Sequence, residues 1–191
     1  MIDWIKNINK KYPEFWKKYL LTFEEKSNRY ISIALETTGL DAEKDLILSI
    51  AAISIVNNTI AIGDNFEINI SQKNNFHEDL SLSAQKINEI EAIELFLDFI
   101  KNAVLIGHRI YFDIEIINEA LNKIDCGRLK NEALDIEIMY KKLHDLNDDK
   151  SFSLDELVSF YKIPKSKVST PDEAFSIALL FLKLKSKLGI I

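Results

Sequence analysis

The feature of this sequence that most constrains its fold is one long apolar run, LILSIAAISIV, which covers Leu46–Val56. Its β-branched content is typical of a buried strand, and the run is too short to span a bilayer as a helix. Asn57-Asn58 follows it directly, and a second strand-like run covers Thr59–Ile70. Because asparagine tolerates the positive φ angles of a tight turn, the pattern predicts a β-hairpin.

Strand and helix signals continue on both sides of this hairpin. A first strand is expected at Tyr30–Glu36. The apolar spacing after the hairpin predicts, in order, a helix over Ile90–Ile100, a strand over Ala103–Ile106, a helix from Asp113, a strand near Ala133–Ile136, a helix through Tyr140, a helix at Ser153–Tyr161 and a last helix from Thr170. This order favours an α/β fold in which helices flank a mixed five-stranded sheet.

The first 29 residues have a helical pattern of their own, so we expect an N-terminal helical extension (1–29) followed by the main domain (30–191). Pro13 separates two apolar stripes and suits the first position of the second helix. The stripes are formed by Trp4, Ile5 and Ile8, and by Phe15, Trp16, Tyr19, Leu20 and Phe23. The large rings either pack back onto the sheet, which is the favoured arrangement, or form a surface for a protein partner.

Composition and charge restrict the class of protein. A single cysteine, Cys126, excludes an internal disulfide and fits a reducing compartment, and the N-terminus lacks the apolar stretch of a secretory signal, so we expect a cytoplasmic protein with no membrane contact. The chain carries a net charge of −6, whereas residues 1–29 carry +3 and residues 162–191 carry +4, which leaves −13 for the middle. This distribution argues against tight binding of a phosphate backbone without metal, but it is compatible with a metal-dependent nuclease.

Three motifs occur in order on the predicted elements. ETTGL (Glu36–Leu40) follows the first strand, IGHRIYFD (Ile106–Asp113) follows a later strand, and YKIPKSKVSTPDEAF (Tyr161–Phe175) leads into the last helix. Together they resemble the proofreading-type, DnaQ-like 3′–5′ exonucleases of the DEDD superfamily, whose fold is ribonuclease H-like. The resemblance covers about Tyr30 to Leu184.

This resemblance implies a specific chemistry. In the family, two divalent ions hold the terminal phosphate and activate a water molecule, and carboxylates supply the oxygen ligands that Mg²⁺ requires. The carboxylates come from Asp-x-Glu on the first strand, one Asp in the second motif and one Asp in the third, and one branch adds a histidine as general base. The implied cofactor is Mg²⁺ or Mn²⁺, and the implied substrate is the 3′ end of single-stranded DNA or RNA.

Carried over residue by residue, the family pattern is incomplete here. Glu36 and Asp113 occupy two of the acidic positions, and both are candidate metal ligands. Glu173 occupies the third-motif Asp position, Ala34 replaces the first Asp and Val168 replaces the general base. A register shifted by one residue would place Asp172 in the acidic position and Lys167 in the base position. We therefore expect a degenerate metal site.

Each candidate acid also has a structural explanation. Glu36 could be a solvated acid at a strand end, and Asp113 could cap its helix or complement the helix dipole. Thr170-Pro171-Asp172-Glu173 has the pattern of a capping box, which favours a capping role for Glu173 over a catalytic one.

The remaining candidates would bind substrate. Thr37, Thr38 and Leu40 match family positions that seat the terminal nucleotide, although Gly39 could instead supply an unusual φ angle for a simple turn. His108 is more often a structural histidine, and Arg109, where the family often has Asn, could pair with Glu36 or Asp113. His77 and His144 lie in polar segments without ligand spacing, so no zinc site can be built.

Three functions remain open from the sequence. The preferred one is an exonuclease-family protein that has lost most or all catalysis through Ala34 and Val168. The second is an active metal-dependent 3′–5′ exonuclease that uses Glu36, Asp113 and Glu173. The third is a non-catalytic module that binds a protein partner through its N-terminal helices.

Overall fold

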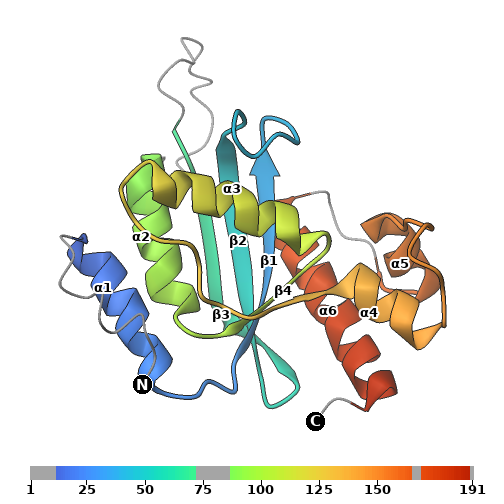
Figure 1. Ribbon diagram of the computed structural model, residues 1–191. Coiled ribbons are helices and arrows are strands. Elements are labelled where there is room, and N and C mark those ends of the chain that lie inside the picture. The colour runs from blue at the N-terminus through green and yellow to red at the C-terminus, as the bar shows by residue number, and fades with distance from the viewer. Residues whose placement is uncertain (1–11, 72–86, 165–168, 190–191) are drawn as a thin grey trace.

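A mixed five-stranded sheet forms the centre of the molecule, as the sequence predicts. The computed structural model describes residues 12–71, 87–164 and 169–189. Within them the strand order is β3-β2-β1-β4-β5 (Figure 1). The strands are β1 (Tyr30–Thr37), β2 (Ile47–Val56), β3 (Thr59–Asn69), β4 (Val104–Gly107) and β5 (Ala133–Asp135). β1, β2 and β3 pair antiparallel, whereas β4 is parallel to both β1 and β5.

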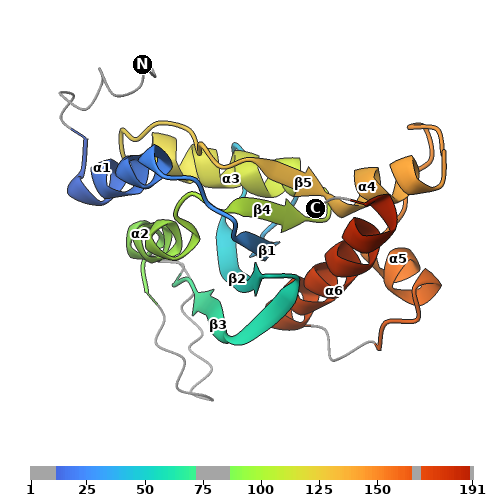
Figure 2. The same ribbon diagram turned by 90° about the horizontal axis from the view of Figure 1, so that it is seen from below.

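Helices cover both faces of this sheet. They are α1 (Glu14–Leu21), the short 3₁₀ helix η2 (Thr22–Glu24), α2 (Glu89–Ile100), α3 (Ile110–Asn122), α4 (Ile136–Leu143), α5 (Leu154–Phe160) and α6 (Thr170–Leu188). Figure 2 shows α1, α2 and α3 on one side of the strands and α4, α5 and α6 on the other. Side chains alternate along the strands, so Ile33 joins the apolar cluster of the first side and Ala34 joins that of the second.

The hairpin between β2 and β3 forms at the predicted residues. Asn57 and Asn58 have φ angles of 51° and 58°, the left-handed values that a two-residue hairpin turn needs. Lys185 near the end of α6 reaches this turn, since its Nζ donates a hydrogen bond to Asn58 Oδ1 at 2.8 Å. The C-terminal part of α6 is thereby fixed to the hairpin.

The aromatic stripe of the N-terminal helix packs against the rest of the molecule. Trp16 and Tyr19 are only 1% and 2% exposed and belong to the same core cluster as Ile31 and Phe96. Both rings are therefore buried, with α1 packed against α2 rather than directly on the sheet, and both are unavailable to a protein partner. α1 begins at Glu14, one residue later than expected, with Pro13 at its N-cap. Trp4, Ile5 and Ile8 lie outside the described residues.

The helices in the described parts of the chain include none that is long and apolar enough to cross a membrane.

Candidate active site

The candidate acids come from three elements that meet at one end of the sheet. Glu36 lies near the C-terminal end of β1, Asp113 lies in the first turn of α3, and Glu173 lies in the first turn of α6. In Figure 1 the start of α6 lies beside the upper part of β1, and α3 crosses in front of the strands. The structure thus gathers the three motifs around the end of β1, as the resemblance implies.

Ala34 is part of the apolar core. It is 3% exposed, pairs with Ala51 on β2 in the strand register, and shares the cluster with Ala174 of α6. The three small side chains belong to the cluster in which α6 packs against β1 and β2. A position where the family pattern requires a carboxylate is therefore occupied by apolar packing.

Glu36 is exposed and is held by a chain of hydroxyl groups. Ser49, its partner across β1 and β2, donates from Oγ to Glu36 Oε2 at 3.2 Å. The same Ser49 Oγ lies 2.7 Å from Thr170 Oγ1. A serine hydroxyl has one proton, so Ser49 must accept the hydrogen bond of Thr170 when it donates to Glu36. The chain links β1, β2 and the first residue of α6.

The start of α6 differs from the sequence prediction, so Glu173 does not occupy the capping-box position that was expected for it. Ser169 is the N-cap residue; its Oγ accepts the backbone N–H of Asp172 and donates to the Asp172 carboxylate at 2.6 Å. The expected capping box from Thr170 to Glu173 is therefore wrong by one residue, because Ser169 takes the capping position. Glu173 is exposed and lies within electrostatic range of Asp113 and His108.

Asp113 and Glu173 both hold their protons more tightly than ordinary carboxyl groups. Burial raises the pKa of Asp113 well above its usual value, and the negative charges of Glu173 and Asp135 raise it further. Although Glu173 is exposed as a residue, partial desolvation of its carboxyl group raises its pKa; the charge of Asp155 adds to this, whereas His108 opposes it. Like charges that are close together in a poorly solvated place disfavour ionisation of both groups.

The helix that carries Asp113 begins at Ile110 rather than at Asp113. Arg109 precedes it in a left-handed conformation with φ 56° and makes no capping bond with its side chain. Asp135 supplies the acceptor instead: its Oδ2 accepts the N–H of Ile110 at 3.0 Å, and its Oδ1 accepts the N–H of Glu137 at 2.8 Å. The capping explanation for Asp113 is wrong, because Asp135 caps both α3 and α4.

The loop between β4 and α3 is bound to a buried carboxylate. Glu137 is 6% exposed, and its Oε2 lies 3.4 Å from Arg109 Nε and 3.7 Å from His108 Nε2. His108 also has the carbonyl oxygen of Phe152 at 2.8 Å from its Nε2. The hypothesis that Arg109 pairs with Glu36 or Asp113 is wrong, whereas His108 has the hydrogen-bonded structural environment that was preferred for it.

The ETTGL turn is held by side chains rather than by a special glycine conformation. Thr37 Oγ1 donates to the carbonyl oxygen of Gly39 at 2.7 Å, and Thr38 Oγ1 donates to Asp45 Oδ1 at 2.7 Å. The only described glycine with positive φ is Gly189, so the expected unusual angle at Gly39 is wrong. A Cβ at position 39 would lie 2.5 Å from Asp45 Oδ2, so glycine leaves room for that carboxylate. Leu40 is 88% exposed.

One of the carboxylate positions of the family pattern is occupied by Ala34 in this chain. Across residues 12–71, 87–164 and 169–189, no three or more His, Cys, Asp or Glu side chains are grouped to hold a metal ion. Ala34 offers no ligand. Val168, Lys167 and His77 lie outside the described residues.

Three residues of this region were missed by sequence reasoning: Ser49, Asp135 and Glu137. Asp135 had a readable signal, since an acid between a short strand and a helix is a typical N-cap. Ser49 and Glu137 had none, because their partners are brought to them only by the sheet register and by the packing of α4.

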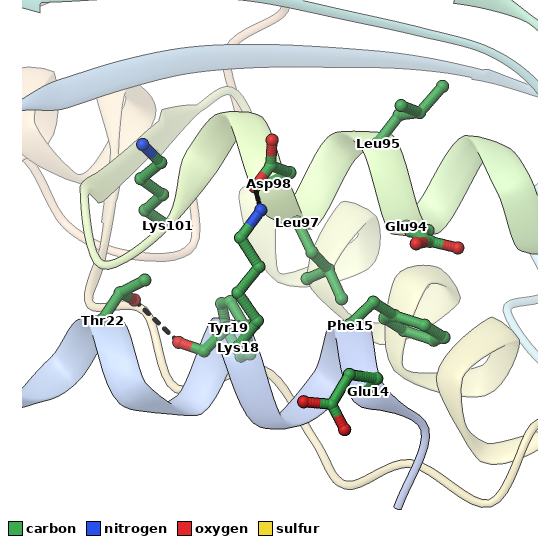
Figure 3. A pocket seen from close by; sticks show the side chains of 10 residues that line it. All are labelled: Glu14, Phe15, Lys18, Tyr19, Thr22, Glu94, Leu95, Leu97, Asp98 and Lys101. Atoms are coloured by element: carbon green, nitrogen blue, oxygen red, sulfur yellow. Dashed lines mark hydrogen bonds and ion pairs between the residues drawn. The ribbon is translucent and has the colours of Figure 1, made fainter.

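A separate pocket of about 290 Å³ lies between α1 and α2 (Figure 3). Phe15 and Leu97 contribute to its lining, and Lys18 reaches across to Asp98 with its Nζ 2.6 Å from Oδ1. The described residues that line it include none of the candidate site residues. The pocket is therefore separate from the candidate site at the end of β1.

Comparison with known proteins agrees with this architecture. The model of the RNase T family, whose description is "Exonuclease", matches residues 31–168 of this chain. The chain is 29% identical over 170 residues to the PolC-type DNA polymerase III of Caldanaerobacter subterraneus subsp. tengcongensis; the match covers 83% of this chain but 12% of that polymerase. It is 31% identical over 179 residues to the DNA polymerase III subunit epsilon of Buchnera aphidicola subsp. Baizongia pistaciae, covering 85% of this chain and 70% of that subunit.

Solved structures show the same fold. The chain superimposes on E. coli exonuclease I in complex with a dA16 oligonucleotide with a TM-score of 0.70 at 15% identity, covering 85% of this chain and 42% of that one. The chain thus spans a small part of the PolC-type polymerases and less than half of exonuclease I. The family match over most of its length, together with the similarity to the epsilon subunit, shows that this chain belongs to the RNase T-type, DnaQ-like 3′–5′ exonuclease family with a ribonuclease H-like fold.

Proposed function

We propose that this chain binds the 3′ end of a single-stranded nucleic acid and hydrolyses it weakly or not at all. The observation that carries the proposal is the burial of Ala34, at 3% exposure, against Ala51 and Ala174. Ala34 supplies no ligand at a position where the family pattern has a carboxylate, and it lies in an apolar cluster instead. Removal of one such group commonly costs orders of magnitude in rate.

The state of the remaining acids supports impaired catalysis. The raised pKa of Asp113 favours its neutral form, and the pKa of Glu173 is raised as well. Glu36 is exposed, but its carboxylate accepts a hydrogen bond from Ser49. A set of three acids, two of them with a raised pKa and none at position 34, is a weaker basis for holding two divalent ions than the carboxylates of the family pattern.

The test is a time course on 5′-labelled single-stranded DNA and RNA in Mg²⁺ and, separately, in Mn²⁺. Glu36→Ala, purified in parallel, controls for a contaminating nuclease. We expect no shortening from the 3′ end beyond that seen with Glu36→Ala, while the parent chain shifts the same strands in a binding assay. Trimming by the parent alone would refute the loss of catalysis, and failure to bind any strand would refute the binding function.

One observation favours the alternative of an active enzyme. Asp113 and Glu173 are close enough for the charge of Glu173 to raise the pKa of Asp113, so a cation placed between them would relieve this repulsion. An enzyme that used Glu36, Asp113 and Glu173 would lose turnover in both Glu36→Ala and Asp113→Ala. Equal cleavage by the parent and both variants would instead identify a contaminant.

A further inference from the structure

A buried carboxylate beside the candidate site gathers several cationic groups. Glu137 accepts the N–H of Phe152 at 3.0 Å, and its Oε1 lies 3.0 Å from Lys141 Nζ. Its other oxygen faces Arg109 Nε at 3.4 Å and His108 Nε2 at 3.7 Å. Burial disfavours the charge of Glu137, but the hydrogen bonds from Phe152, Lys141 and Arg109 together lower its pKa, so this carboxyl is ionised at neutral pH.

Two cationic side chains, Lys141 and Arg109, contact the Glu137 carboxylate. One carboxylate faces two permanently cationic side chains, and Lys141, which is 12% exposed, has the shorter and better enclosed contact with it. Arg109 has the longer contact, and its side chain remains 59% exposed. Lys141 therefore neutralises Glu137, whereas the guanidinium of Arg109 keeps a surplus charge at the surface.

The guanidinium is held in place with part of its hydrogen-bonding capacity unused. Nε donates to Glu137, and Nη2 donates to Ser151 Oγ at 2.7 Å. Among the described residues, Nη1 has no acceptor. A guanidinium fixed along one edge is suited to binding the oxygens of a phosphate.

The backbone of Arg109 is also unusual for its residue type. Its φ of 56° and ψ of 40° lie in the left-handed region, which costs a residue other than glycine or asparagine roughly 1–2 kcal/mol. Such a conformation is retained where surrounding contacts enforce it, and it is commoner at functional sites than elsewhere. Here the contacts with Glu137 and Ser151 hold the side chain.

Arg109 places a positive charge near the candidate acids, where it would offset their repulsion of a phosphate. Arg109 directly precedes α3, whose first turn carries Asp113, so the loop that carries Arg109 borders the candidate acids. Without metal ions, any carboxylate charge at this end of the sheet repels the phosphates of a bound strand. We propose that Arg109 binds a backbone phosphate of the single-stranded nucleic acid near its 3′ end, with Glu137 as the positioning residue. This inference rests on the binding function proposed above.

The experiment measures binding of a fluorescent oligothymidylate by anisotropy in EDTA over a series of salt concentrations. The test variant is Arg109→Asn, because asparagine tolerates the left-handed backbone and the variant should therefore fold. The matched control is Arg128→Asn, since Arg128 has a similar exposure of 62% and also pairs with a carboxylate, Glu115. Thermal melting of each variant checks that the fold is retained.

We expect Arg109→Asn to bind about tenfold more weakly than the parent at low salt. The slope of log K against log salt should become shallower by about 0.7, as for one lost phosphate contact on a single strand. Arg128→Asn should stay within about twofold of the parent. Glu137→Gln should weaken binding while leaving the salt slope unchanged, because the arginine keeps its charge but loses its anchor.

The outcomes separate this inference from the proposed function. If the parent binds the strand and the two arginine variants behave alike, the role of Arg109 is refuted and the binding function stands. If the parent binds no strand even at the lowest salt, both are refuted. A selective loss in Arg109→Asn with a shallower slope supports both.

Discussion

The raised pKa of Asp113 makes a specific prediction about stability. Replacing Asp113 with Asn keeps the shape of the side chain but removes its titration. In the folded protein the carboxyl lies half-buried near Glu173 and Asp135, and these features raise its pKa from the ordinary value of 3.8. Its place in the first turn of α3 opposes this shift, since a helix N-terminus favours a negative charge by roughly 0.3–1 kcal/mol. Burial and repulsion dominate.

The direction of the pH effect follows from proton linkage. The folded protein binds this proton more tightly than the unfolded chain does, so the stability contributed by protonated Asp113 is complete below pH 3.8 and is lost as the pH rises through the folded pKa. Between these two values the parent loses up to about 1.4 kcal/mol per pH unit relative to Asp113→Asn. The variant should therefore match the parent near pH 3.5 and become the more stable protein at pH 7–8.

The assay is urea denaturation at half-unit steps of pH, followed by tryptophan fluorescence, because Trp16 is buried in the core. Glu115→Gln is the control with the opposite sign. Its hydrogen bond with Arg128 lowers the pKa of Glu115, so the stability it contributes is present above pH 4.5 and is lost as the pH falls through the folded pKa. A stability difference between Asp113→Asn and the parent that does not change with pH would refute the reasoning.

Three further predictions concern the elements around the site. Ala34→Asp should lower the free energy of unfolding by about 3 kcal/mol in EDTA, because it buries an unpaired polar group, and Mg²⁺ should raise the melting temperature of this variant but not that of the parent. Ser169→Ala should lower the free energy of unfolding, measured by urea denaturation, by about 1 kcal/mol, because the N-cap of α6 is lost, whereas Thr170→Ala should leave this cap intact. A loss of the cap in Thr170→Ala but not in Ser169→Ala would instead support Thr170 as the N-cap. Gly39→Ala should cost about 1 kcal/mol because its Cβ displaces the Asp45 carboxylate from its hydrogen bonds, while Gly63→Ala, which meets no atom within 4 Å, should change stability by less than about 0.5 kcal/mol.

The sheet could be read from the sequence because its signals are local. The apolar run of β2 and the Asn57-Asn58 turn specify the hairpin without reference to the rest of the chain, and both are found as predicted. The three motifs also come together as expected. The first two follow β1 and β4, whose C-terminal ends lie at the same end of the sheet, and the third leads into α6 beside it. Ala34 was identified from the family resemblance, which has an Asp two residues before the position of Glu36.

The errors arise where a partner lies far away in the sequence. Ile110 begins α3 because its N–H is bound by Asp135, which is 25 positions later. Arg109 pairs with Glu137, 28 positions later, because α4 brings that carboxylate under the loop. The start of α6 is a different kind of error: Ser169 and Thr170 are both good caps, and a pattern cannot choose between neighbours of similar propensity.

The packing of Ala34 also affects how the family site can change over generations. A site that loses a ligand but keeps an open space can regain it by a single substitution. Here Ala34 lies in an apolar cluster with Ala51 and Ala174, so a returning carboxylate would weaken the fold whenever no metal is bound. Under the proposed function, selection for a stable fold therefore opposes the return of catalysis.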